Sequence, residues 1–312
     1  MFGQEHAEAV QSHGAAGEKF NAGTVIIEHV SNSGIDHPLI HLPTIAGIDL
    51  SVTKHVLMLW VVAAVLFLSV TVAVRRYLKQ DRLIPSGFMN GLEFVVEFIR
   101  DSIVQPNVGK KWVLTWTPLI LTLFLFILTA NAIGMLPIFE VIELLNRYVL
   151  HMGPETFVGK LIHGGSTATG NFNVTAALAT ITFVAIIVAG TKAHGFVKHW
   201  ANLVPHGLNP AIYVILIPIE ILGMFVRPFA LTMRLAANMT GGHIAILTLL
   251  SFVFIFTELF QHAAAGFGVG FAVALPLAGA ISGLEIIVVI VQAYVFTLLT
   301  AVFVGMAIHA HH

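Results

Sequence analysis

The chain has 312 residues, of which 57% are hydrophobic and only 10% are charged, and its mean hydropathy is +0.90. These values describe a lipid-embedded, polytopic protein rather than a water-soluble domain. The net charge of −1 argues against a nucleic-acid-binding surface, and the lack of cysteine excludes disulfides and thiolate metal sites.

Residues 1–50 are polar, rich in glycine and histidine, and without a sustained hydrophobic period. They predict an extramembrane N-terminal arm. The first ten residues contain neither a basic patch nor an apolar run, so they resemble neither a secretory signal nor a transit peptide. We therefore expect membrane insertion to depend on internal helices.

The first predicted transmembrane helix covers residues 55–74, an apolar run of about the 20 residues that one span needs. The basic stretch 75–82 follows it directly. Basic flanks are typical of the cytoplasmic side, so we expect the N-terminal arm on the opposite, periplasmic side and the C-terminus in the cytoplasm.

The next segment, 85–104, mixes apolar and charged residues in a pattern that is too polar to span but typical of an amphipathic helix at the membrane surface. Residues 113–136 and 173–190 are the second and third predicted spans. Seven of the fifteen Lys and Arg residues lie in 75–111, between the first two spans. This charge distribution supports the same orientation.

The C-terminal third contains two apolar stretches, 210–260 and 271–309, that are both longer than an upright helix needs. They predict a pair of long, strongly tilted helices joined by a turn at 261–270. The glycines of this turn do not follow a strand, so they do not form a nucleotide-binding loop, and we expect no ATP site in this chain. The predicted fold class is an all-α polytopic membrane protein with about three upright spans, one amphipathic surface helix and a long, tilted C-terminal helical hairpin.

Arg234 lies in the middle of the first long stretch, with apolar sequence on both sides. A guanidinium stays charged in a protein and costs several kcal/mol at bilayer depth, so it persists there only with a partner or a water-lined cavity. Arg234 is therefore predicted to be functional.

Helical spacing aligns further polar residues in two rows. Glu220 and Arg227 precede Arg234 by steps of seven, which keep all three on one helix face with a drift of about 20° per step. Glu285 and Gln292 are also seven apart on the last predicted helix.

His243 is nine residues beyond Arg234, about 180° around the same helix, whereas Asn238 stays near the Arg234 face. A histidine and Glu285 within one apolar hairpin predict a proton relay, and we expect the two side chains to be in contact. A buried structural histidine with an acidic partner is the alternative.

Other polar residues also have structural alternatives. Glu220 and Arg227 fit an ion pair or snorkelling near the cytoplasmic end of their helix. Asn238, Gln292 and Asn131 fit interhelical hydrogen bonds.

Sixteen histidines raise the possibility of a membrane haem or copper enzyme, but such sites need pairs of histidines on facing spans at matching depth. Only His243 is deep in the predicted topology, so we expect no metal and no cofactor. His194, His199 and His206 lie in a basic segment, and we expect them to be solvated.

Several sequence motifs of the C-terminal half occur together in one known family: Pro218-Ile-Glu220, Arg234-Leu-Ala-Ala-Asn238-Met-Thr-Gly-Gly-His243, Glu285 and Gln292-Ala-Tyr-Val-Phe. Supporting motifs are Asn90-Gly-Leu-Glu93, Leu128-Thr-Ala-Asn131 and Thr169-Gly-Asn171-Phe-Asn173-Val-Thr175. The chain resembles the subunit a family of F-type ATP synthases over most of residues 52–308.

The resemblance implies a non-catalytic, proton-translocating stator subunit with two offset half-channels. Arg234 would face the ring of c-subunits, with Gln292 beside it on the neighbouring helix. The half-channel from the periplasmic side would involve Asn238, His243, Glu285 and Asn131, and Glu220 would lie near the cytoplasmic exit. The implied partners are the c-ring, the b-subunit peripheral stalk, the lipid bilayer and protons, and the implied location is the bacterial inner membrane, with the mitochondrial inner membrane as the alternative.

One departure from the family pattern concerns the relay. Many bacterial relatives have Glu at the position of His243 and His at the position of Glu285. The exchanged order resembles the mitochondrial arrangement and leaves open which of the two groups takes the incoming proton first.

A secondary transporter or channel is the alternative from another functional class, with Arg234 as an anion clamp and His243 and Glu285 as a proton relay. Such proteins normally show internal repeats and paired broken helices. The sequence shows neither, so the rotary stator is favoured.

Overall fold

The computed structural model describes residues 51–80, 84–135, 168–201, 210–260 and 270–309, together with the single positions 146, 151, 153, 156, 264 and 268. Every regular element within these residues is a helix, and five of the helices are long and apolar enough to cross a membrane. The predicted all-α polytopic class is confirmed. The N-terminal arm 1–50 and most of the turn 261–270 lie outside the described residues.

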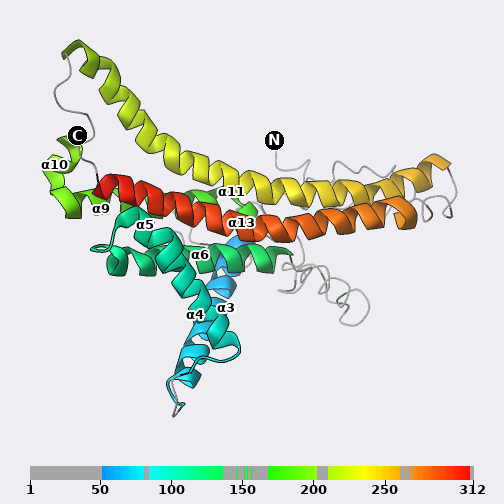
Figure 1. Cartoon of the computed structure of the whole chain (residues 1–312). Coiled ribbons are helices and arrows are strands. Elements are labelled where there is room, and N and C mark those ends of the chain that lie inside the picture. The colour runs from blue at the N-terminus through cyan, green and yellow to red at the C-terminus, as the bar shows by residue number, and fades with distance from the viewer. Residues whose placement is uncertain are drawn as a thin grey trace.

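The first long helix is α3 (Lys54–Tyr77), which ends where Arg75 and Arg76 occupy its last turn. Basic side chains at this end complement the partial negative charge of the helix C-terminus. Most of its apolar surface is not covered by the rest of the chain, since only 11% of its most apolar window is buried. In Figure 1, α3 and α4 (Phe88–Glu97) run beside each other and away from the long C-terminal helices.

The amphipathic segment continues from α4 into the π-helix η2 (Phe98–Val104) and the short α5 (Gln105–Val108). Ile99, Ile103 and Val104 of η2 are fully buried in the main core, where η2 packs against α6 (Val113–Met135) and α13 (Leu275–Ile308). The second half of this amphipathic segment therefore presents its apolar face to protein, while Phe94 in the first half is exposed.

The α6 helix and α9 (Phe172–His194) form the middle of the bundle, with the 3-10 turn η4 (Ala168–Gly170) directly before α9. Asn171 caps α9, because its side chain accepts a hydrogen bond of 2.8 Å from the amide of Asn173. Small residues such as Ala179, Ala185 and Ala189 make up much of the buried face of α9, and they let neighbouring helices approach closely.

The C-terminal pair consists of α11 (Pro210–Phe260) and α13, which is preceded by the π-helix η5 (Gly270–Ala274). The 51 residues of α11 correspond to about 77 Å at 1.5 Å per residue, far more than the hydrocarbon thickness of about 30 Å. Figure 1 shows α11 and α13 side by side over much of their length, with the N-terminal part of α11 bending away. Pro218 and Pro228 inside α11 account for bending, because each removes a backbone donor from the helix.

Candidate functional site

Arg234 projects from the middle of α11 on the face that the rest of the chain leaves uncovered. Its side chain is exposed, while Leu231 and Leu235 beside it are almost fully buried, at 2% and 1% exposure. Among the described residues, no carboxylate forms an ion pair with its guanidinium. The helix is thus anchored through its apolar side and presents the cation outward.

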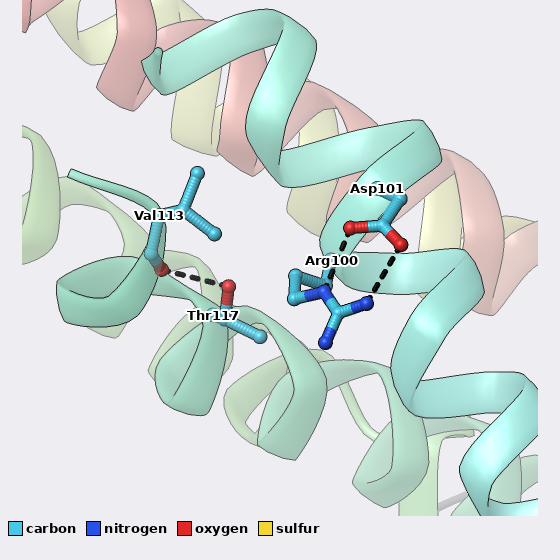
Figure 2. A network of polar contacts seen from close by, with 4 residues as sticks. All are labelled: Arg100, Asp101, Val113 and Thr117. Atoms are coloured by element: carbon cyan, nitrogen blue, oxygen red, sulfur yellow. Dashed lines mark hydrogen bonds and ion pairs between the residues drawn. The ribbon is translucent and has the colours of Figure 1, made fainter. Parts of the chain in front are cut away.

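The ion pair that does form within the described residues lies elsewhere, in η2. Figure 2 shows Arg100 holding Asp101 with two hydrogen bonds, of 2.7 and 2.8 Å, beside the Val113 and Thr117 turn of α6. The hydrogen bond and charge of Asp101 raise the pKa of Arg100, and Arg100 lowers the pKa of Asp101. Because both side chains are exposed, this pair is a local surface feature and contributes little to stability.

Gln292 of α13 ties its helix to α11 directly at Arg234. The amide nitrogen of Gln292 donates to the main-chain carbonyl of Arg234 at 2.8 Å, and its oxygen accepts from the Asn238 amide at 3.3 Å. Gln292 is buried, with 6% exposure. Both ends of one buried amide therefore fix the register of the two helices at the level of the arginine, where the family resemblance implied that Gln292 would lie.

Glu285 is the buried acid of the site, with 7% exposure. Its carboxylate lies against Gly242 of α11, where an added Cβ would come within 2.6 Å of Oε1. The neighbouring His243 is close enough for the charges of the two side chains to interact. The predicted contact of His243 and Glu285 stays a prediction, because within the described residues no hydrogen bond or ion pair joins the two side chains, and Oε1 of Glu285 has no hydrogen-bond partner there.

A second polar group surrounds Asn131 of α6. The Thr169 hydroxyl donates to the Asn131 side-chain oxygen at 2.6 Å, and the Thr240 hydroxyl donates to the carbonyl of Gly170 at 3.2 Å. Asn131 and Thr169 are both fully buried. These bonds link α6, η4 and α11 close to His243, since Thr240 is one turn before the histidine.

The polar side chains of α11 thus follow one another along the helix axis, in a row from His243 through Asn238 to Arg234 whose two ends lie on opposite faces of the helix. Nine residues separate its ends, which corresponds to about 14 Å along the helix axis. Thr169 and Thr240 were missed as site residues by the sequence reasoning. The Thr169-Gly-Asn171 motif was the available signal for the first, whereas nothing in the spacing distinguished Thr240.

Glu220 and Arg227 lie outside this row. The Arg227 guanidinium lies over the ring of Phe303 of α13, 5.6 Å from its centroid, and both Glu220 and Arg227 are half-buried. Glu220 is 14 residues, or about 21 Å of helix, from Arg234. The spacing of seven residues predicted one helix face for Glu220, Arg227 and Arg234. In the structure Glu220 and Arg227 are half-buried, whereas Arg234 is exposed.

The expectation that His199 is solvated is wrong. Its ring is buried at 6% exposure against Gly190, and burial, with the charge of His194, lowers the pKa of His199. The cause is the turn at Gly195, whose φ of +87° lets α10 (Phe196–Ala201) fold back onto α9. His194 is also engaged, because its Nε2 lies 2.9 Å from the carbonyl of Ile308, while His206 lies outside the described residues.

The arrangement defines a class of protein: a polytopic helical membrane protein with ionisable and polar side chains along two long, adjacent helices. Family comparison specifies it further. The sequence pattern of the family described as ATP synthase A chain matches residues 56–305, and the chain belongs to this family.

Similar proteins extend over nearly the whole chain. The ATP synthase subunit a of Chlorobium phaeobacteroides is 38% identical over 99% of this chain and 82% of its own length. The ATP synthase subunit a 2 of Prosthecochloris aestuarii is 38% identical over 97% of this chain and 84% of its own. The ATP synthase subunit a of Anaeromyxobacter is 33% identical over all of this chain and 63% of its own.

Proposed function

We propose that this chain is the proton-conducting stator subunit of a rotary ATP synthase, with Arg234 facing the carboxylates of a ring of c-subunits. The observation that carries the proposal is an outward-facing guanidinium in a long apolar helix, without an acidic partner among the described residues. A permanent charge at bilayer depth needs a counter-charge. A rotor carboxylate supplied by a neighbouring assembly meets that need, whereas the family membership gives no support to a free-standing carrier.

Electrostatics give Arg234 its role. A rotor carboxylate crosses lipid cheaply only when it is protonated, and a nearby permanent cation favours its ionised form, so the acid releases its proton when it reaches Arg234. The same positive charge repels protons that would otherwise pass directly between the two half-channels. Leakage is blocked while rotation continues.

The interaction between stator and rotor must stay incomplete. A dry, well-paired ion pair would hold the ring in one position, because separating two buried charges costs several kcal/mol. Gln292 binds the main-chain carbonyl of Arg234 and the side chain of Asn238, and these bonds leave the guanidinium free to approach and release successive rotor acids.

Protons reach the rotor along the polar row in this proposal. The path from the periplasmic side runs past Asn131 to His243 and Glu285, and then toward Asn238 beside Arg234. Glu220 lies near the cytoplasmic exit. Each proton that moves down a potential of 100 mV supplies about 2.3 kcal/mol, which biases the direction of ring stepping.

The proposed setting is the bacterial inner membrane, with the basic flank of α3 and the C-terminus in the cytoplasm and the N-terminal arm in the periplasm. The c-ring and a b-subunit peripheral stalk are the proposed partners. In this proposal the chemistry of ATP synthesis takes place in other subunits of the complex.

The first prediction tests the arginine. Arg234→Ala and Arg234→Lys are expected to abolish proton-coupled ATP synthesis in inverted membrane vesicles, because lysine is a smaller and more strongly hydrated charge that loses its proton more readily. Arg100→Gln removes an exposed, locally paired arginine and is the matched control, with near-normal synthesis expected. Near-normal coupled synthesis in assembled Arg234→Ala complexes would refute the proposed role.

A further inference from the structure

A cavity lies between α3 and α4, and none of the residues that line it belongs to the proposed proton path. Its volume is about 580 Å³, within the range of about 300–1,000 Å³ that is usual for ligand sites. Leu68, Val72 and Phe88 line one part of it, and Arg76, Gln80 and Ser86 line the other. The cavity is thus apolar at one end and polar and cationic at the other.

The polarity changes along the α3 axis. From Leu68 to Tyr77, where the helix ends, α3 rises by about 14 Å, roughly the hydrocarbon thickness of one leaflet, about 15 Å. The apolar run of α3 ends at Val74, so Leu68 and Val72 lie at hydrocarbon depth and Arg76 lies at the level of the headgroups. A ligand that fills this cavity has an apolar part and a polar part in the same order.

The charge at the polar end is positive. Arg75 and Arg76 occupy the last turn of α3, Lys79 follows, and no acidic side chain is among the described residues that line the cavity. The opposite wall is the start of α4, whose first turn has no side-chain cap and no acidic residue. Free amides at a helix N-terminus add to the attraction for an anion that the basic side chains already provide.

We propose that this cavity binds an anionic diacyl phospholipid, with one acyl chain between α3 and α4 and the phosphate beside Arg76. An arginine forms paired, charge-assisted hydrogen bonds to a phosphate, and Gln80 and Ser86 supply further donors. Basic pockets between helices at this membrane depth are typical of sites for anionic lipid headgroups. The bound lipid would fill the space between α3 and the amphipathic segment, where the chain has little packing of its own.

The test uses the assembled complex in phosphatidylcholine nanodiscs that contain a small fraction of a photoactivatable phospholipid. Phosphatidylglycerol and phosphatidylcholine with the same diazirine-bearing chains are compared, and cross-linked peptides are identified by mass spectrometry. We expect the peptides of residues 68–89 to be labelled about fivefold more by phosphatidylglycerol. Equal labelling by the two lipids would contradict the proposal.

Two pairs of variants separate this site from diffuse attraction. Arg76→Gln should reduce phosphatidylglycerol labelling to the phosphatidylcholine level, whereas Arg75→Gln removes the same charge from a residue that does not line the cavity and should change labelling by less than about twofold. Ala73→Trp fills the cavity and should abolish labelling, and Ala64→Trp on the exposed, unlined part of α3 should not.

The competing occupant is a membrane helix of another subunit. A photoactivatable amino acid at Met89, which lines the cavity, reports the neighbour in the assembled complex. A cross-link to lipid supports the proposal, and a cross-link to a protein subunit overturns it. Equal losses of labelling in Arg75→Gln and Arg76→Gln would also overturn it, because they would show a general effect of surface charge.

Discussion

Glycine at position 242 determines how closely the Glu285 carboxylate approaches α11. The carboxylate occupies the space where any other residue would have its Cβ, beside His243. Gly241, the preceding residue, has open space at the same position. The two adjacent glycines therefore differ in their surroundings, and only the second lets a buried acid lie against α11 beside His243.

Gly242→Ala is predicted to impair proton conduction without unfolding the chain. The new methyl group meets the end of a flexible side chain, so the Glu285 carboxylate moves while the helices stay in place. A displacement of about 1 Å at a proton-transfer group can reduce rates by tenfold or more, so we expect about a tenfold loss of ATP-driven proton pumping in vesicles. Gly241→Ala is the control, and an equal loss in both variants would show that Glu285 is not the cause.

A glycine also permits a close contact between two helices elsewhere in the bundle. Gly305 of α13 lies directly against the main-chain carbonyl of Asn107 in α5, and the Asn107 side chain donates to the carbonyl of Ile103 at 2.7 Å. The end of the amphipathic segment is thereby joined to the C-terminal helix. Because the contact is between two backbones, neither helix can relieve a clash there by rotating a side chain.

Gly305→Ala is therefore predicted to destabilise the packing of α13 on α5. Overpacking of a rigid contact typically costs about 1–3 kcal/mol, which should appear as a lower unfolding temperature of the purified chain in detergent. Gly279→Ala and Gly283→Ala, on the same helix with open space around them, are the matched controls and should leave the unfolding temperature unchanged or slightly higher. An unfolding temperature of Gly305→Ala equal to that of the controls would contradict the close contact.

The architecture of the whole molecule was largely predictable from the sequence because hydropathy and length are local properties. The apolar runs around Arg234 and Gln292 indicated two long helices. That Gln292 lies beside Arg234 was implied by the family resemblance alone, and Gln292 does bond to the main chain of Arg234. The Gly242 contact of Glu285, the Thr240 bond to Gly170 and the burial of His199 depend on which helix faces which. Such contacts have no periodic signal in one chain, so the structure was needed to identify them.

The stability of the whole chain should depend on pH through His199. Burial lowers the pKa of its imidazole below the ordinary value of about 6.5, so the unfolded chain binds a proton at a higher pH than the folded chain does. The contribution of His199 to the free energy of unfolding is then fully present above about pH 6.5. It is lost as the pH falls below that value toward the lower pKa of the folded state, because protons favour the unfolded state. We expect the unfolding temperature to fall between pH 7.5 and 5.5, and the fall to be smaller in His199→Asn.

The control for other histidines is His151→Asn, which changes an exposed histidine and should keep the wild-type slope of unfolding temperature against pH. A His199→Asn slope equal to the wild-type slope would show that the buried ring does not control this dependence.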